Sequence, residues 1–180
     1  MILVGTRYRN EPLRYAGVGW ILISPLLIAL TVTAEGVTWS VAGLIGSFVG
    51  LSAAAAYQVC VLPELRLTKD GVLVVNPFTR YDLPASRIEE VRPSSPTLEV
   101  VLADATPVRV WAVQAANINT ALGRRGHVDR VSEEVGAWVE GRPPAGDEAV
   151  RDPARTDLRF AGALVVAGAL LGVILYLLLT

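Results

Sequence analysis

Residues 67–78 read LTKDGVLVVNPF, and this stretch predicts a water-soluble β-hairpin. Two runs of strand-forming residues flank the polar sequence Lys69-Asp70-Gly71. Asp-Gly between such runs is a strong short-range hairpin signal, because both residues tolerate the positive φ angle of a tight turn. Cys60, seven residues upstream, ends a long apolar segment suited to a lipid bilayer. The sequence therefore predicts membrane spans combined with a small aqueous sheet.

The overall composition also indicates a membrane protein. The chain has 180 residues, of which 52% are hydrophobic and only 18% are charged. With a single cysteine, Cys60, an intramolecular disulfide cannot form. Because His127 is the one histidine, we expect no all-protein zinc site, and no other cofactor is indicated.

Three segments contain no charged residue, namely 15–34, 36–63 and 160–180. A helix of about 20 apolar residues spans a bilayer, so each segment is long enough to cross one. The alternatives are buried helices of a soluble protein and, for the first segment, a signal peptide cleaved after Ala34. The expected organisation is an N-terminal flank at 1–14, a two-helix transmembrane hairpin at 15–61, a β-domain at 62–141, a linker at 142–159 and a third span at 160–180.

Basic residues predict the orientation in the membrane. Arg7, Arg9 and Arg14 precede the first span, further basic residues flank the central region, and the 35–38 loop has none. Because basic flanks stay on the cytoplasmic side, we expect the N-terminus and the β-domain in the cytoplasm. The C-terminus is expected outside, in a multi-pass protein of the plasma membrane.

Small residues in the spans predict close helix packing. Glycines lie in the second span at Gly43, Gly46 and Gly50, and in the third span at Gly168 and Gly172. Such residues let two helix backbones approach closely. Packing of the three helices within one chain is favoured, and self-association through these glycines is the alternative. No Asp, Glu, Lys, Arg or His lies inside a span, so an ion or charged-substrate pathway is not expected.

The central region alternates between apolar and polar residues, as strands do. The runs are ELRLT (64–68), RYDLP (80–84), RIEEVRP (87–93), TLEVVLAD (97–104) and PVRVWAV (107–113). After them the period changes to that of a helix, with an apolar stripe at Val128, Val131, Val135, Trp138 and Val139. We predict a small antiparallel barrel or sandwich capped by a C-terminal helix.

These motifs resemble a known family. LRLTKDGVLVVNPF (65–78), YDLPASRIEEV (81–91) and LADATPVRVWAV (102–113), followed by an amphipathic helix, are similar to bacterial pleckstrin-homology (PH-like) domains. In particular they resemble the PH domain of the low-molecular-weight protein antigen 6 family of actinobacteria, over residues 62–141. The resemblance implies a seven-stranded, helix-capped barrel beside membrane helices, with no catalytic residue and no known ligand.

Basic residues of the β-domain are the candidate contacts to lipid or partner. One group, Arg66, Lys69, Arg80 and Arg87, surrounds the first hairpin, and a second group, Arg124, Arg125 and Arg130, precedes or opens the last helix. Headgroup binding normally requires a basic cluster, whereas this region is slightly more acidic than basic. Ordinary solvated surface charge is therefore the alternative interpretation of both groups.

The sequence does not predict an enzyme. It contains no G-x-S-x-G, P-loop or H-E-x-x-H pattern. The leading hypothesis is a PH-like domain for protein interaction or membrane-complex assembly, with another membrane protein as partner and no role for nucleic acid. An anionic-lipid-binding sensor and an accessory subunit of a membrane enzyme or transporter are the alternatives.

Overall fold

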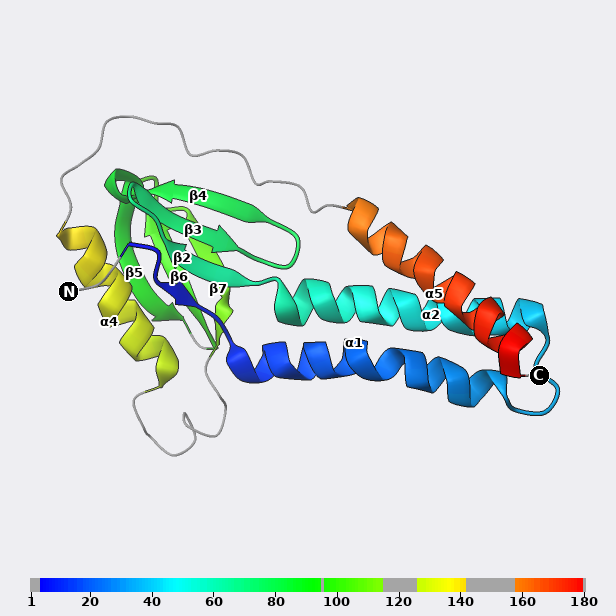
Figure 1. Cartoon of the computed structure of the whole chain (residues 1–180). Coiled ribbons are helices and arrows are strands. Elements are labelled where there is room, and N and C mark those ends of the chain that lie inside the picture. Colours follow the sequence, from blue (N-terminus) through cyan, green and yellow to red (C-terminus); the bar gives the residue numbers. More distant parts are fainter. Residues whose placement is uncertain (1–3, 95, 115–125, 142–157, 180) are drawn as a thin grey trace. The chain divides into compact units, whose positions relative to one another are not determined.

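The computed structural model describes residues 4–94, 96–114, 126–141 and 158–179, in two compact units (Figure 1). The β-unit is formed by Met1–Asn10 and Leu62–Thr156, and the helical unit by Glu11–Val61 and Asp157–Thr180. The predicted fold class is confirmed: three long apolar helices accompany a small antiparallel β-domain and its C-terminal helix.

The β-domain consists of two antiparallel sheets and one helix. Strands follow one another in chain order within each sheet. The first sheet contains β1 (Arg7–Tyr8), β2 (Glu64–Leu67), β3 (Gly71–Val75) and β4 (Arg80–Pro84). The second contains β5 (Ile88–Ser94), β6 (Thr97–Leu102) and β7 (Pro107–Gln114). Helix α4 (His127–Glu140) packs against the second sheet, as the apolar stripe predicted.

The seventh strand comes from an unexpected part of the chain. β1 lies within residues 1–14, which the sequence analysis treated only as a flank of the first span. It pairs antiparallel with β2, with Tyr8 opposite Leu65, and the Gly5 amide donates to the Leu67 carbonyl at 2.8 Å. The membrane hairpin is therefore inserted between two neighbouring strands of one sheet.

Residues 67–78 include the β2–β3 turn and strand β3, as predicted, but Gly71 has a different role from the expected one. Its φ angle is not positive; among the described glycines only Gly5 and Gly36 have that conformation. A Cβ atom at Gly71 would instead lie 2.8 Å from the carbonyl carbon of Leu83 on β4. Gly71 is thus required by the close approach of β3 and β4, while Thr68 closes the turn by accepting a hydrogen bond from the Gly71 amide at 3.1 Å.

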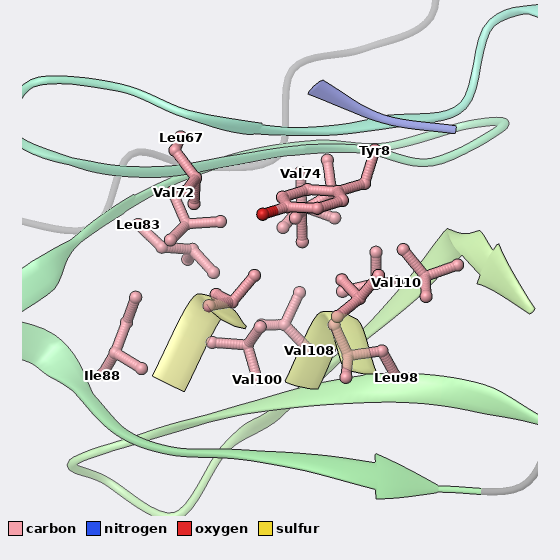
Figure 2. Packing of buried hydrophobic residues seen from close by; sticks show 14 of the residues in the cluster. Tyr8, Leu67, Val72, Val74, Leu83, Ile88, Leu98, Val100, Val108 and Val110 are labelled. Carbon is pink, nitrogen blue, oxygen red and sulfur yellow. The ribbon is translucent and has the colours of Figure 1, made fainter. Parts of the chain in front are cut away.

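A single apolar core lies between the two sheets. In Figure 2 the Tyr8 ring points into this core beside Val74, and side chains of the second sheet face it from the other side. Helix α4 contributes Val128, Val131, Val135 and Trp138, all of them buried, and the Ser132 hydroxyl donates to the Val91 carbonyl of β5 at 2.8 Å. Burying each large apolar side chain stabilises the fold by about 1.5–3 kcal/mol, so α4 is an integral part of the domain.

The helical unit contains α1 (Glu11–Val32), α2 (Trp39–Ala56) and α5 (Leu158–Leu179). A π-helical turn, η1 (Tyr57–Val61), extends α2. Among the described residues, three helical segments are long and apolar enough to cross a membrane. Helix α1 begins four residues before the uncharged segment, because the charges of its first turn are compatible with helix: Glu11 favours the N-terminus and pairs with Arg14 at 3.5 Å.

The five glycines of the spans pack α2 against α5 inside one chain. A Cβ atom on Gly46 would lie 2.9 Å from the carbonyl carbon of Gly168, and one on Gly168 would lie 2.9 Å from the Cα of Gly50. Gly172 faces Ala42 and Gly46, and Gly43 faces Val173. Each of these glycines is covered by the neighbouring helix of the same chain, which agrees with the favoured interpretation, and self-association through them stays an untested alternative.

Helix α1 contacts the end of the second span by a similar close approach. A Cβ atom on Gly17 would lie 2.6 Å from the Cβ of Cys60 in η1. Further along, the Trp20 indole donates to the Ser52 hydroxyl at 3.1 Å. Cys60 is thus a small packing residue at a helix contact.

Candidate functional site: the outer face of the first sheet

Two arginines lie directly opposite each other on the face of the first sheet that points away from the core. Arg7 of β1 is paired in register with Arg66 of β2. Tyr8, Leu65 and Leu67 point into the core, so strand alternation directs Arg7 and Arg66 outward. Neither arginine forms an ion pair with another residue that the structure describes. Like charges directly opposite on adjacent strands repel, so this position is suited to an external anion.

Arg9, the first residue after β1, forms an ion pair with Glu64 at the start of β2. The Arg9 guanidinium donates from Nε to Glu64 Oε2 at 3.1 Å, and a second nitrogen of Arg9 contacts the same oxygen. Glu64 is therefore neutralised by Arg9. The outer face of β1 and β2 consequently carries three arginines and one glutamate, and we call Arg7, Arg9, Arg66 and Glu64 the arginine face.

The predicted basic residues near the first hairpin do not form one cluster. Arg66 belongs to the arginine face, whereas Arg80 begins β4 and lies opposite Val75. Lys69 lies in the β2–β3 turn at the far end of these strands, 3.6 Å from Asp70. Arg87 ends the short 3₁₀ helix between the sheets.

The second predicted group is only partly described. Arg124 and Arg125 lie outside the described residues. Arg130 is on α4, where its guanidinium is 3.1 Å from His127 Nδ1 and 3.9 Å from Glu134. Its charge is therefore already engaged by neighbours on the same helix, at i−3 and i+4.

Helix α4 is connected to β1 by a partly buried hydrogen bond. The Tyr8 hydroxyl donates to Glu134 Oε2 at 2.9 Å. Burial of Tyr8, reinforced by this hydrogen bond and by the Glu134 charge, raises the pKa of the Tyr8 phenol to about 12. At the start of α4, burial and then the Arg130 charge lower the pKa of His127, so the imidazole is more easily neutral than a free histidine.

Tyr8→Phe should destabilise the β-domain by about 1.5–3 kcal/mol at neutral pH, because it removes a hydrogen bond to a charged acceptor. A raised folded-state pKa means that the contribution of Tyr8 is complete below pH 10, the ordinary tyrosine pKa, and is lost as the pH rises through about 12. Denaturant titration between neutral and alkaline pH measures both effects. Tyr81→Phe, on β4 beside the same core, is the matched control. Equal stability of the two variants would contradict the structural role of the Tyr8–Glu134 bond.

The outer face of the second sheet carries an ion-paired ladder that sequence reasoning missed. Glu99 of β6 accepts from Arg92 of β5 at 3.4 Å and from Arg109 of β7 at 3.3 Å. A hydrogen bond from Ser94, followed by those from the two arginines, holds the pKa of Glu99 below its usual range. Charges of opposite sign in register across three strands support the sheet rather than form an open anion site.

Comparison with known protein families identifies the part of the β-domain that contains β2 to β7. Residues 62–125 match the family model described as Bacterial PH domain. The chain carries a bacterial PH domain. No curated protein and no solved structure matches the chain. The match covers residues 62–125, so β1 with Arg7, the following Arg9 and helix α4 lie outside the matched part.

The chemistry that the arginine face offers is electrostatic and hydrogen-bonding. In the part of the chain that the structure describes, no group of three His, Cys, Asp or Glu residues could hold a metal ion. The arginine face instead presents guanidinium groups, which bind carboxylates and phosphates through paired N–H donors. Sequence reasoning found Arg66 but not its neighbours Arg7 and Arg9. The RYR sequence at 7–9 is too short to show strand alternation, so no local signal pointed to these two arginines as part of a sheet.

Proposed function

We propose that this protein is a membrane-anchored interaction module, whose PH domain recruits another protein during assembly of a membrane complex. The observation that supports this function is the insertion of the membrane hairpin between β1 and β2. Tyr8 is three residues from the start of α1, and Val61 is three residues from the start of β2, so each connection can extend no more than about 11 Å.

Short connections on both sides restrict the PH domain to the surface of the bilayer. This restriction raises the effective concentration of the domain toward partners in the same membrane without improving any individual contact. An additional interaction surface is then sufficient to recruit a partner, and the arginine face is the candidate surface. The same position would suit an accessory subunit of a membrane enzyme or transporter.

The proposed location is the plasma membrane, with the PH domain in the cytoplasm and the C-terminus outside. Pairing of β1 with β2 supports a location of the N-terminal residues and the PH domain on the same side of the membrane, because both strands belong to one sheet. Arg7, Arg9 and Arg14 before the first span support the cytoplasmic side. Labelling of a Lys69→Cys variant by a membrane-impermeant thiol reagent in intact cells would contradict this orientation.

Affinity purification of the full-length chain from its native membrane in mild detergent, read by mass spectrometry, tests the proposal. We expect a stoichiometric partner with the wild-type chain and its loss with the double variant Arg7→Glu/Arg66→Glu. Lys69→Glu, a charge reversal in the β2–β3 turn, is the matched control and should retain the partner. Recovery of the wild-type protein without any stoichiometric partner would contradict the proposed function.

Binding of anionic lipid is a second candidate function, favoured by the pairing of Arg7 with Arg66. Each basic residue near an anionic leaflet contributes about 1 kcal/mol to membrane attraction. In the same purification, this function predicts enrichment of anionic lipid that falls with salt and is lost in the Arg7→Glu/Arg66→Glu variant. Unchanged lipid content in that variant would exclude the arginine face as the lipid site.

The more specific family assignment is also part of the proposal. The motifs at 65–78, 81–91 and 102–113 support membership in the low-molecular-weight protein antigen 6 PH-domain family of actinobacteria. The membrane helices that accompany the domain are consistent with it. An alignment of homologues in which β1, the membrane hairpin and β2 occur together in this order would test the assignment.

A further inference from the structure

Two aromatic side chains are exposed on neighbouring parts of the PH domain. Phe78, in the turn between β3 and β4, is 67% exposed, and Trp111, on the outer face of β7, is 41% exposed. Asn76 connects these two places: its side-chain amide donates to the Arg109 carbonyl at 2.7 Å and accepts from the Trp111 amide at 2.9 Å. Phe78 is only two residues from Asn76, so these hydrogen bonds bring together the two chain segments that carry the aromatic residues.

The position of Asn76 is defined by hydrogen bonds. Its backbone amide donates to the Thr79 carbonyl at 2.8 Å, which closes the β3–β4 turn. Its side chain forms hydrogen bonds with the Arg109 carbonyl and the Trp111 amide of β7, the edge strand of the second sheet. Exposure of Phe78 therefore occurs in an ordered turn that is fixed to both sheets. We call Phe78, Trp111 and the turn 76–79 the aromatic edge.

The aromatic edge lies at the end of the first sheet where the chain arrives from its membrane spans. β2 begins at Glu64, three residues after the second span ends at Val61. β3 runs antiparallel to β2 and ends with Val75 opposite Glu64, so the 76–79 turn continues past the edge at which β2 begins. β1 ends at this edge as well, with Tyr8 opposite Leu65 and α1 beginning at Glu11.

We propose that the aromatic edge lies in the interfacial region of the bilayer that the chain spans, with Phe78 in contact with lipid. Aromatic side chains favour the boundary between headgroups and acyl chains. Basic residues lie close to both aromatic residues in the chain. Arg80, two residues after Phe78, begins β4. The side chain of Arg109, two residues before Trp111, is 80% exposed, although it also forms an ion pair with Glu99. An apolar group flanked by guanidinium groups is the pattern by which interfacial segments bind a membrane surface.

This contact concerns the bilayer itself and goes beyond recruitment of a partner through the arginine face. Attachment through the two connections alone allows the PH domain to rotate about them. A third contact through the aromatic edge would restrict that rotation and set the direction in which the arginine face is presented. A protein cover for Phe78 is the competing explanation, and the experiment distinguishes it from lipid.

Site-specific fluorescence in the full-length chain tests the inference. In a Cys60→Ala background, Phe78→Cys is labelled with an environment-sensitive fluorophore such as NBD, and the chain is reconstituted into nanodiscs of phosphatidylcholine and phosphatidylglycerol. Lipids with a nitroxide near the headgroup act as the quencher. Lys69→Cys, in the turn at the opposite end of the first sheet, is the matched control, and Thr79→Cys reports on the same turn if Phe78→Cys does not fold.

We expect the label at 78 to emit at a shorter wavelength than the label at 69. We also expect nitroxide lipid to quench most of the emission of the label at 78 and little of the emission of the label at 69. Water-like emission at 78 without quenching would overturn the inference. Short-wavelength emission at 78 that nitroxide lipid does not quench would also overturn it, since protein would then cover the position. Equal quenching at 78 and 69 would show that the aromatic edge has no preferred contact with lipid.

Discussion

Gly46→Leu is expected to separate α2 from α5 and to abolish the native packing of the helical unit. At Gly46 the neighbouring atoms are the backbone of Gly168 and the Cα of Gly172, which cannot move aside as a flexible side chain could. Overpacking in a well-packed interior costs about 1–3 kcal/mol, and a clash with backbone should reach the upper end of that range. Thermal unfolding of the full-length chain in detergent micelles measures the loss.

Gly162→Leu is the matched control for this experiment. Gly162 lies on α5, and a Cβ atom there would meet nothing within 4 Å, so the same substitution should leave the unfolding temperature close to that of the wild type. The comparison also removes the general effect of replacing glycine by leucine in an apolar helix. Equal unfolding temperatures for Gly46→Leu and Gly162→Leu would show that α2 and α5 do not pack through their glycines.

Trp138→Ala should have the largest effect in the PH domain, with a loss of about 3–5 kcal/mol. The Trp138 side chain is 7% exposed and is the largest side chain that α4 contributes to the core between the sheets. Truncation leaves a cavity that the valines of α4 cannot fill without moving the helix. Hydrogen exchange of the full-length chain in micelles measures the effect as lost protection of β5, β6, β7 and α4.

Trp111→Ala is the control for Trp138→Ala, because it removes a tryptophan from the surface instead of the core. Trp111 is on the outer face of β7 and exposed, so its removal in micelles should cost less than about 1 kcal/mol. The protection of the second sheet should then remain close to that of the wild type. If Trp138→Ala and Trp111→Ala reduced protection equally, α4 would not be the main support of the second sheet.

Much of this fold could be predicted from the sequence, because its elements carry strong local patterns. Long uncharged segments predicted the three spans, and the spacing from Val128 to Trp138 predicted α4 and its buried side. β1 could not be predicted, because a two-residue strand has too few positions to show alternation. Its partner β2 is also more than fifty residues away, beyond any local signal.

The site was harder to predict than the fold, because it depends on pairings between distant residues. Arg66 was identified as a basic residue near a hairpin, but only the register with β1 places Arg7 beside it. Lys69 and Arg80 are close to Arg66 in sequence, yet the hairpin directs Lys69 to the far end of the sheet. For the glycines, the sequence favoured packing within one chain over self-association, and the neighbouring backbone atoms show such packing between α2 and α5.

The insertion of the membrane hairpin between β1 and β2 also orders the events of biosynthesis. The ribosome releases β1 first, then the two spans, and only afterwards the strand that β1 must pair with. Tyr8 therefore has no strand to pair with and no core to pack into until both spans have inserted and the chain has returned to the side on which it began. A chain whose spans insert incorrectly leaves β1 and β2 on opposite sides, and its sheet lacks an edge strand. Completion of the sheet is in this sense coupled to insertion of both spans.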